Sequence, residues 1–327
     1  MKYAFVAPDA ESICLQYRDF ASIENGMLIK LADKNRRFAK LLSICGMGNL
    51  HCSYWLYEYL LKKAFTSVND DSDERICFIL YSRVYESFRA QICKFLRKNY
   101  KDCIIVVYYG DLISRHIGSI NEAKKDADLV CVFDEEDAKI YEVDWLLEPF
   151  SESIREFDFL SPDANPIRWD VTFVGHAKNR YKKIIKLYEK LTEAGLVCDF
   201  NIVGVPEKDR LYSSAIKYEN LSFRELLRHV VSSRCVAEIM QDKGISPTTR
   251  YTESMIFYKN LLTDCVAFES NTPPNVIFFK DIEDIDADKV KEIKILHEYN
   301  RQVYYDMFSI KTMLESINTI LHKRKIL

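Results

Sequence analysis

Short apolar runs, separated by longer amphipathic stretches, constrain the fold of this chain more than any other feature. In the first half, residues 41–45, 76–81, 103–109 and 129–133 are apolar almost throughout, and helix-like stretches lie between them. A strand with apolar residues on both sides must be covered on both faces, as in a parallel sheet flanked by helices. The first half is therefore predicted to be an α/β domain.

The second half of the chain begins the same pattern again. Residues 169–175 and 198–204 are predicted strands that end in glycine, residues 222–232 a helix, and residues 235–240 a further strand. Between the two halves, three prolines among Ser, Asp and Asn residues indicate a domain boundary. We expect an α/β fold of two Rossmann-like domains that face each other across a cleft.

The expected domain limits follow from these changes of pattern. The first domain covers residues 1–150, a linker covers residues 151–168, and the second domain covers residues 169–305. A final helix at 306–327 can cross back to the first domain. The length of 327 residues and a hydrophobic content of 48% suit two domains with separate cores.

Composition excludes several classes of protein. A net charge of −3 argues against a general nucleic-acid binder, which needs a basic footprint. The ten cysteines form no CxxC pair, so zinc-knuckle and thioredoxin-type motifs are not expected, and buried reduced thiols of a cytoplasmic protein explain them. The sequence shows neither a secretion signal nor an apolar run of the roughly 20 residues that span a bilayer.

The segment from Gly244 to Glu253 has the pattern of a glycine loop that opens a helix. Ser246 is predicted to be the N-cap and Pro247 the first helical residue. Unpaired amides and the helix dipole at such a start favour an anion. Arg250 and Glu253, three residues apart, would share a helix face, either toward a ligand or as an ordinary surface pair.

Two further loops are expected beside this segment. Ligands of doubly wound sheets bind beyond the carboxyl ends of the strands, where loops enter helices. In the second half these loops are 175–180, 204–206 and 244–250, and each contains glycine. The sequence therefore predicts one ligand site that all three loops share.

The order of these pieces resembles the GT-B type of glycosyltransferase, close to bacterial transferases of lipopolysaccharide or capsule assembly. Four segments carry the resemblance, which covers most of the chain in pattern: residues 128–139, 170–180, 201–205 and 244–253. Many GT-B enzymes carry a second glutamate seven residues after the first in the donor helix. Here that position is Asn260, so Glu253 would act alone on the ribose.

The resemblance implies that the second domain binds a nucleotide-diphosphate sugar. Arg180 and Arg250 would face the diphosphate in place of a metal ion, so neither a metal ligand nor a cofactor is expected. Tyr218 would pack against the base, although a core or surface role is the alternative. The implied donor-site residues are Gly175, Arg180, Gly204, Tyr218, Ser246, Thr248, Thr249, Arg250 and Glu253.

The charged residues next to these positions can also be explained without a ligand. Lys178, Lys182 and Lys183 are interpreted as a solvated basic loop. Glu238, at the exit of a predicted strand, suits a sugar hydroxyl, or it is the solvent-facing end of an edge strand.

An inverting transferase needs a base in the acceptor domain to deprotonate the attacking hydroxyl, whereas a retaining enzyme can do without one. Asp111, directly after a buried run and glycine, is the first candidate, and His51 is the second. Asp9 and Glu11 after the first strand are further candidates. A dinucleotide motif at 46–51 fails, because His51 stands where the third glycine belongs.

These observations predict a metal-independent hexosyltransferase that extends a lipopolysaccharide or capsule glycan from a nucleotide sugar. Its partners would be the nucleotide sugar and a glycan or lipid-linked glycan acceptor, without nucleic acid. The alternatives are a nucleotide-sugar epimerase, a glycan pyruvyl transferase, or a non-catalytic assembly subunit. A cytoplasmic location is expected, and the basic end 322–325 is either ordinary helix C-terminal charge or a contact with the inner face of the membrane.

Overall fold

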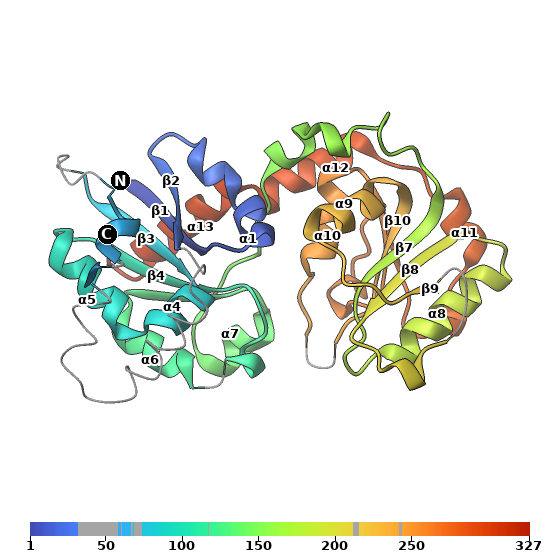
Figure 1. Cartoon of the computed structure of the whole chain (residues 1–327), viewed down its shortest axis with the longest axis horizontal. Coiled ribbons are helices and arrows are strands. Elements are labelled where there is room, and N and C mark those ends of the chain that lie inside the picture. The colour runs from blue at the N-terminus through green and yellow to red at the C-terminus, as the bar shows by residue number, and fades with distance from the viewer. Residues whose placement is uncertain are drawn as a thin grey trace. The chain divides into compact units, whose positions relative to one another are not determined.

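A computed structural model of the chain shows two compact units (Figure 1). The structure describes residues 1–31, 58–59, 61–66, 68, 74–116, 118–211, 216–241 and 244–327. One unit contains Met1–Ser151 and Ile310–Leu327, and the other contains Glu152–Ser309. The predicted strand at 41–45 lies outside the described residues. No helix among those that are described is long and apolar enough to cross a membrane.

The first unit is built on a parallel sheet with the strand order β2-β1-β3-β4-β5-β6. Strands β3 and β4 are buried at every residue, as their continuous apolar sequences predict. The strands are β1 (Lys2–Pro8), β2 (Gly26–Leu31), β3 (Ile76–Tyr81), β4 (Ile104–Tyr109), β5 (Leu129–Val132) and β6 (Asp144–Trp145).

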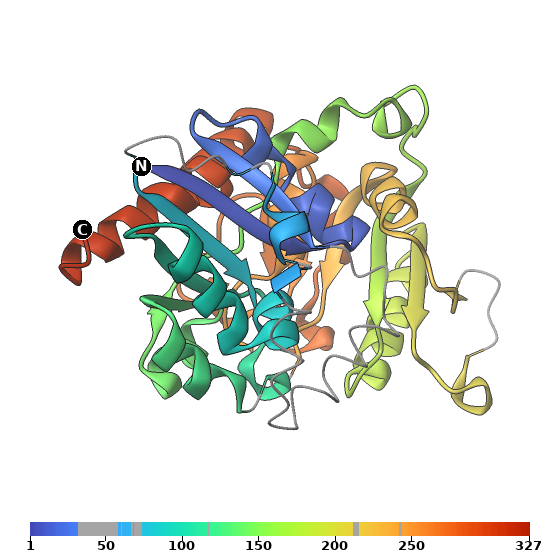
Figure 2. The same cartoon turned by 60° about the vertical axis from the view of Figure 1, so that its left-hand side comes forward.

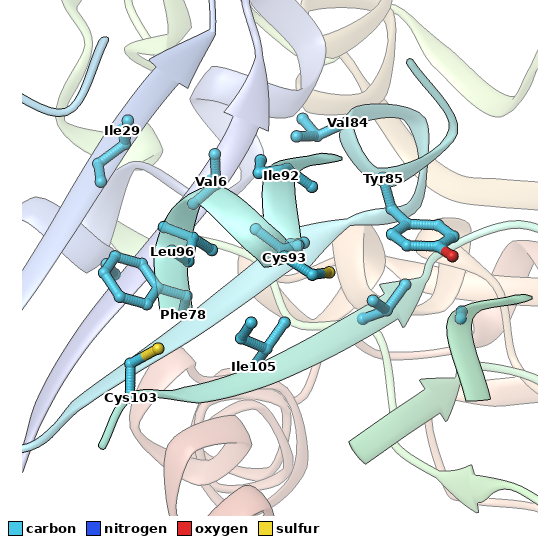
Figure 3. Packing of buried hydrophobic residues seen from close by; sticks show 14 of the residues in the cluster. Val6, Ile29, Phe78, Val84, Tyr85, Ile92, Cys93, Leu96, Cys103 and Ile105 are labelled. Carbon is cyan, nitrogen blue, oxygen red and sulfur yellow. The ribbon is translucent and has the colours of Figure 1, made fainter. Parts of the chain in front are cut away.

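Helices cover both faces of this sheet. On one face, residues such as Val6, Phe78 and Ile105 pack against α4 and α5 (Figure 3). On the other face, the intervening residues pack against α1 and the C-terminal helix α13, which runs along the sheet (Figure 2). The helices are α1 (Glu11–Gln16), α4 (Ser82–Phe88), α5 (Ala90–Asn99), α6 (Ser119–Asp126), α7 (Glu135–Tyr141) and α13 (Ile310–Lys323).

The second unit contains another parallel sheet, in the order β12-β11-β10-β7-β8-β9. The chain starts at β7, moves outward to β9, and then returns to β10 on the other side of β7. This is the Rossmann strand order, with its switch point between β7 and β10. The strands are β7 (Trp169–His176), β8 (Cys198–Val203), β9 (Ile216–Lys217), β10 (Ser233–Glu238), β11 (Asn260–Thr263) and β12 (Val276–Phe278).

Helices flank the second sheet as well (Figure 1). Helices α8 and α11 pack on the face that presents Val171, Phe173 and Phe200, and α9 and α10 lie on the opposite face. The predicted fold class, α/β with two Rossmann-like domains, is therefore confirmed. The helices are α8 (Tyr181–Glu193), α9 (Phe223–Val231), α10 (Thr249–Ile256), α11 (Ala287–Glu292) and α12 (His297–Val303).

Candidate functional site

The carboxyl ends of β7 and β10 form the switch point of the second sheet. From β7 the chain turns into α8 on one face, and from β10 it turns into α10 on the other. Loops that part in this way leave a crevice at the ends of the strands, where ligands of such folds bind.

Arg180 connects the ends of the two strands. Its guanidinium donates hydrogen bonds to the carbonyl oxygen of Ile239, just after β10, and to that of His176, the last residue of β7. The guanidinium carbon also lies 5.8 Å from the ring centroid of Phe173. Arg180 thus places a permanent positive charge at the switch point, and its contact with a phosphate stays a prediction.

Lys183, one turn further along, adds a second cation to this edge of the sheet. Its ammonium group lies 2.5 Å from Asp264, which directly follows β11 and is only 6% exposed. The same carboxylate accepts a hydrogen bond of 2.6 Å from the amide of Met240. Lys183 lies in helix α8 and not in a loop, and its side chain is 40% exposed, so it is solvated as predicted but also paired with a buried carboxylate.

Helix α10 begins two residues later than the sequence predicts. Thr248, and not Ser246, is the N-cap, and its hydroxyl accepts a hydrogen bond from the amide of Arg250. Pro247 accordingly precedes the cap, and Thr249 is the first helical residue. The prediction placed the cap at Ser246 because serine before proline suits a helix start, but Ser246 is buried in the loop with 3% exposure.

A buried carboxylate accepts a hydrogen bond from the N-cap residue of α10. Glu238, the last residue of β10, accepts hydrogen bonds of 2.5 Å from the hydroxyl of Thr248 and 2.6 Å from that of Thr263. Burial raises the pKa of Glu238, and the two hydroxyl contacts partly oppose this. Because β10 is an inner strand and Glu238 is 2% exposed, the alternative of a solvent-facing edge position is wrong.

Arg250 and Glu253 form an ion pair on α10. The Arg250 guanidinium contacts the Glu253 carboxylate and donates a second hydrogen bond of 2.7 Å to the carbonyl oxygen of Val174 in β7. Glu253 is 1% exposed, whereas the side chain of Arg250 is 20% exposed. Burial raises the pKa of Glu253, and the neighbouring charge of Arg250 opposes this. The pair is therefore no exposed surface contact, and the carboxylate orients the guanidinium.

The remaining donor-site residues have defined surroundings. Gly204 directly follows β8 with a positive φ of 81°, which favours glycine, and an added Cβ would meet His176 at 3.3 Å. Gly175 leaves only ordinary contacts for a Cβ. The Tyr218 hydroxyl bonds to the Tyr181 hydroxyl and to the backbone of Leu211, and burial raises the pKa of Tyr218 to about 12. Contacts of Tyr218 with a base and of Glu253 with a ribose stay predictions.

The candidate bases lie in the first unit. Asp111 follows β4 and is half-buried, and its carboxylate accepts a hydrogen bond of 3.0 Å from the Leu112 amide. Asp9 follows β1, and Glu11 lies in the first turn of α1. His51 lies outside the described residues.

A second polar group, which no local sequence pattern indicates, lies near the end of β4. The Nδ1 atom of His116 contacts the carboxylate of Glu86, and the Ser119 hydroxyl bonds to both Glu86 and Tyr109. His116 and Glu86 are 30 residues apart, so no local pattern connects them. Among the described residues, no three His, Cys, Asp or Glu side chains are grouped to hold a metal ion.

Solved structures share this arrangement over nearly the whole chain. An alpha,alpha-trehalose-phosphate synthase (UDP-forming) from Burkholderia vietnamiensis is similar with a TM-score of 0.57 and 10% identity, over 99% of this chain and 100% of that chain. An alpha-glucosyltransferase in complex with UDP-glucose and DNA containing an abasic site has a TM-score of 0.59 and 12% identity, with 98% of each chain covered. A glycosyltransferase from Rickettsia africae ESF-5 has a TM-score of 0.53 and 11% identity, again over 98% of each chain.

These similarities define the fold. No protein-family model matches the sequence, and no curated protein matches it. The chain has the α/β architecture of two Rossmann-like domains found in GT-B glycosyltransferases.

Proposed function

We propose that the protein is a glycosyltransferase that moves a hexosyl group from a nucleoside-diphosphate sugar to a glycan acceptor, in lipopolysaccharide or capsule assembly and without a metal ion. One observation carries the proposal: Arg180, Lys183 and Arg250 are gathered at the switch point of a Rossmann sheet. Cations at this place suit a diphosphate. The GT-B fold and the sequence resemblance support the same activity.

The residues of the second unit would act on the leaving group. An acceptor hydroxyl oxygen forms a bond to the anomeric carbon, and the bond from that carbon to the diphosphate oxygen breaks. The electron pair of the broken bond stays on the nucleoside diphosphate, so negative charge grows there. Arg180 and Arg250 are held in place before the reaction and stabilise this charge without reorganising.

Glu253 and Asp264 are positioning residues in this scheme. Glu253 is 1% exposed and contacts Arg250, whereas Asp264 contacts Lys183 and the amide of Met240. Arg250 has five N–H donors, and its contacts with described residues use only some of them. Donors therefore remain for phosphate oxygens after the guanidinium has been fixed.

The acceptor side of the reaction belongs to the first unit. If the reaction inverts the anomeric carbon, Asp111 takes the proton of the attacking hydroxyl, with His51 as the alternative base. A glycan or a lipid-linked glycan is the proposed acceptor, and contact of the protein with the inner face of a membrane is part of the same proposal.

The test is turnover of nucleotide sugars. UDP-, GDP-, dTDP- and CMP-sugars are incubated with the protein and a glycan acceptor, and the released nucleotide and the extended glycan are measured. We expect release of the nucleotide and extension of the glycan in equal amounts with one of the UDP-, GDP- and dTDP-sugars. Transfer from the CMP-sugar alone would contradict a diphosphate donor. Conversion to an isomeric nucleotide sugar without transfer would show an epimerase, and unchanged donors with every acceptor would show a non-catalytic subunit.

Matched variants assign the activity to the strand ends. Arg180→Gln and Arg250→Gln each remove a cation that we place on the diphosphate, and turnover should fall at least a hundredfold in each. Lys186→Gln removes a cation from the exposed side of the same helix as Lys183, where Lys186 pairs with the exposed Glu283. This control should keep its activity within about twofold.

A further inference from the structure

A pocket of about 460 Å³ lies on the second unit, away from the strand ends described above. Its lining includes Trp169, where β7 starts, and Ser232, just before β10. Strand β7 runs from Trp169 to His176, and seven steps of about 3.3 Å put roughly 23 Å between its two ends. The pocket is therefore a separate place on the sheet, and its volume suits a small organic molecule.

Positive charge dominates the lining of this pocket. Arg168, Lys217 and Arg228 provide three cations, and Glu225 provides one carboxylate. Lys217 pairs at 3.5 Å with the buried Asp199. In contrast, neither Arg168 nor Arg228 makes a side-chain ion pair or hydrogen bond with a described residue. Two guanidinium groups are thus available to a carboxylate or phosphate group, which their geometry fits well.

Two buried polar side chains offer hydrogen bonds in the same pocket. Asn165 is 8% exposed and uses its amide nitrogen to bond the carbonyl oxygens of Phe159 and Ser161. Those bonds fix its orientation, and Oδ1 has no hydrogen-bond partner among the described residues. Ser232 is 4% exposed, and its hydroxyl likewise has no such partner. Both side chains line the pocket, so hydroxyl groups of a ligand can pair with them.

A histidine and two aromatic rings complete the lining. The Nδ1 atom of His229 contacts the carboxylate of Asp199, so Nε2 is the nitrogen that a ligand can use. The imidazole stacks on Trp169 with ring centroids 5.3 Å apart and an angle of 6°. Phe159 lines the same pocket, and Arg228 lies 5.6 Å from its ring centroid. These contacts hold the rings in fixed orientations beside the polar groups.

We propose that this pocket binds an acidic monosaccharide unit, a hydroxylated ring that carries a carboxylate or a phosphate group. Arg168 and Arg228 bind the anionic group, while Asn165, Ser232 and His229 pair with ring hydroxyls. Phe159 and Trp169 border the sugar ring as lining residues of the pocket. The segment that precedes β7 at the start of the second unit provides Phe159, Asn165 and Arg168. A bound ligand therefore joins this segment to helix α9.

Calorimetric titration of the full-length protein tests this site without any turnover. The probes are glucuronate for the carboxylate class, glucose 6-phosphate for the phosphate class, and glucose as the neutral counterpart. We expect at least one acidic probe to bind, and glucose to bind at least tenfold more weakly, because charge-assisted hydrogen bonds are the stronger ones. Failure of both acidic probes to bind at millimolar concentration, or equal binding of glucose, would overturn the proposal.

Variants locate the binding. In Arg168→Gln/Arg228→Gln the affinity should fall at least tenfold, whereas Arg224→Gln should stay within about threefold. Arg224 lies on the same helix and over the same Phe159 ring, but it does not line the pocket. Arg250→Gln should leave the affinity unchanged, since Arg250 belongs to the strand ends. Loss of binding in Arg250→Gln, or retention in the double variant, would refute the site.

Discussion

At the scale of single residues, Arg250 combines two roles that a pair of variants separates. Arg250→Gln leaves the buried carboxylate of Glu253 without its cation, and breaking such a pair costs roughly 3–5 kcal/mol. Nucleotide affinity should fall about tenfold or more, since a charge-assisted hydrogen bond is lost. In Arg250→Gln/Glu253→Gln the buried charge is also gone, so urea denaturation should show most of the stability restored while calorimetry shows affinity still low. Recovery of both would contradict the phosphate role of Arg250.

Glu238 predicts a pH dependence of stability. Its folded-state pKa is raised above the ordinary 4.5, so the folded protein holds this proton more tightly than the unfolded chain does. The contribution of Glu238 to stability therefore falls as the pH rises from about 4.5 through the folded-state pKa. Glu238→Gln cannot ionise, and we expect its stability relative to the wild-type protein to increase between pH 5 and pH 8, measured by urea denaturation.

Glu225 supplies a control of opposite sign. Hydrogen bonds from the side chain and backbone of Ser222 lower the pKa of Glu225, so its contribution is present above pH 4.5 and is lost as the pH falls. Glu225→Gln should therefore be less stable than the wild-type protein at pH 5 and pH 8 alike, with a smaller difference at pH 3. The same pH trend in both variants would show that the carboxylate of Glu238 is not buried as described.

Residues such as Arg180 and Arg250 could be selected from the sequence, because strand-end loops of parallel sheets converge whatever the side chains around them. Their fixed partners could not be selected. Lys183 and Asp264 are 81 residues apart, and Glu238 meets Thr263 only because β10 and β11 are neighbours. Pairings of this kind depend on the strand order and the register, which no local pattern contains.

At the scale of elements, the start of α10 is the junction on which the site depends. Thr248→Ala removes both the cap and a hydroxyl contact of Glu238, which should cost about 1–2 kcal/mol and weaken nucleotide binding by moving Arg250. Thr248→Ser should keep both properties. Ser222→Ala removes the cap of α9 and its capping box, so it should cost about 1 kcal/mol without changing nucleotide affinity. Equal loss of affinity in both alanine variants would contradict a local role for Thr248.

The position of this cap depends on a residue outside the helix and its loop. Ser246 before Pro247 has the sequence pattern of a helix start. The local sequence gives no stronger indication that Thr248, before Thr249, is the N-cap. The buried carboxylate of Glu238 decides between them, because it needs a hydroxyl donor and Thr248 supplies one at 2.5 Å. The helix itself was predictable from the glycine loop and proline that precede it, but its first residue depends on a contact from another strand.

At the scale of the whole molecule, each unit has its own sheet and core, so stability is not a single quantity. Helix α13 completes the core of the first unit, and Ile317 on this helix is fully buried. Ile317→Ala should lower the free energy of unfolding of the first unit by about 2–5 kcal/mol. Nucleotide should still raise the midpoint of the unfolding transition of the second unit, which calorimetry measures. A single transition that shifts in both experiments would contradict two separately folded units.

We propose that a nucleoside diphosphate binds at the strand ends of the second unit. The most direct measurement is a thermal-shift series of UDP, GDP, CMP and dTDP on the wild-type protein, Arg180→Gln, Arg250→Gln and Lys186→Gln. A nucleotide present at a hundredfold excess over its Kd should stabilise the folded state by about 2.7 kcal/mol. We expect UDP, GDP or dTDP to do so in the wild-type protein and in Lys186→Gln, and not in the two arginine variants; CMP, which is a monophosphate, should not. No shift with any nucleotide, or an equal shift in all four proteins, would contradict the claim.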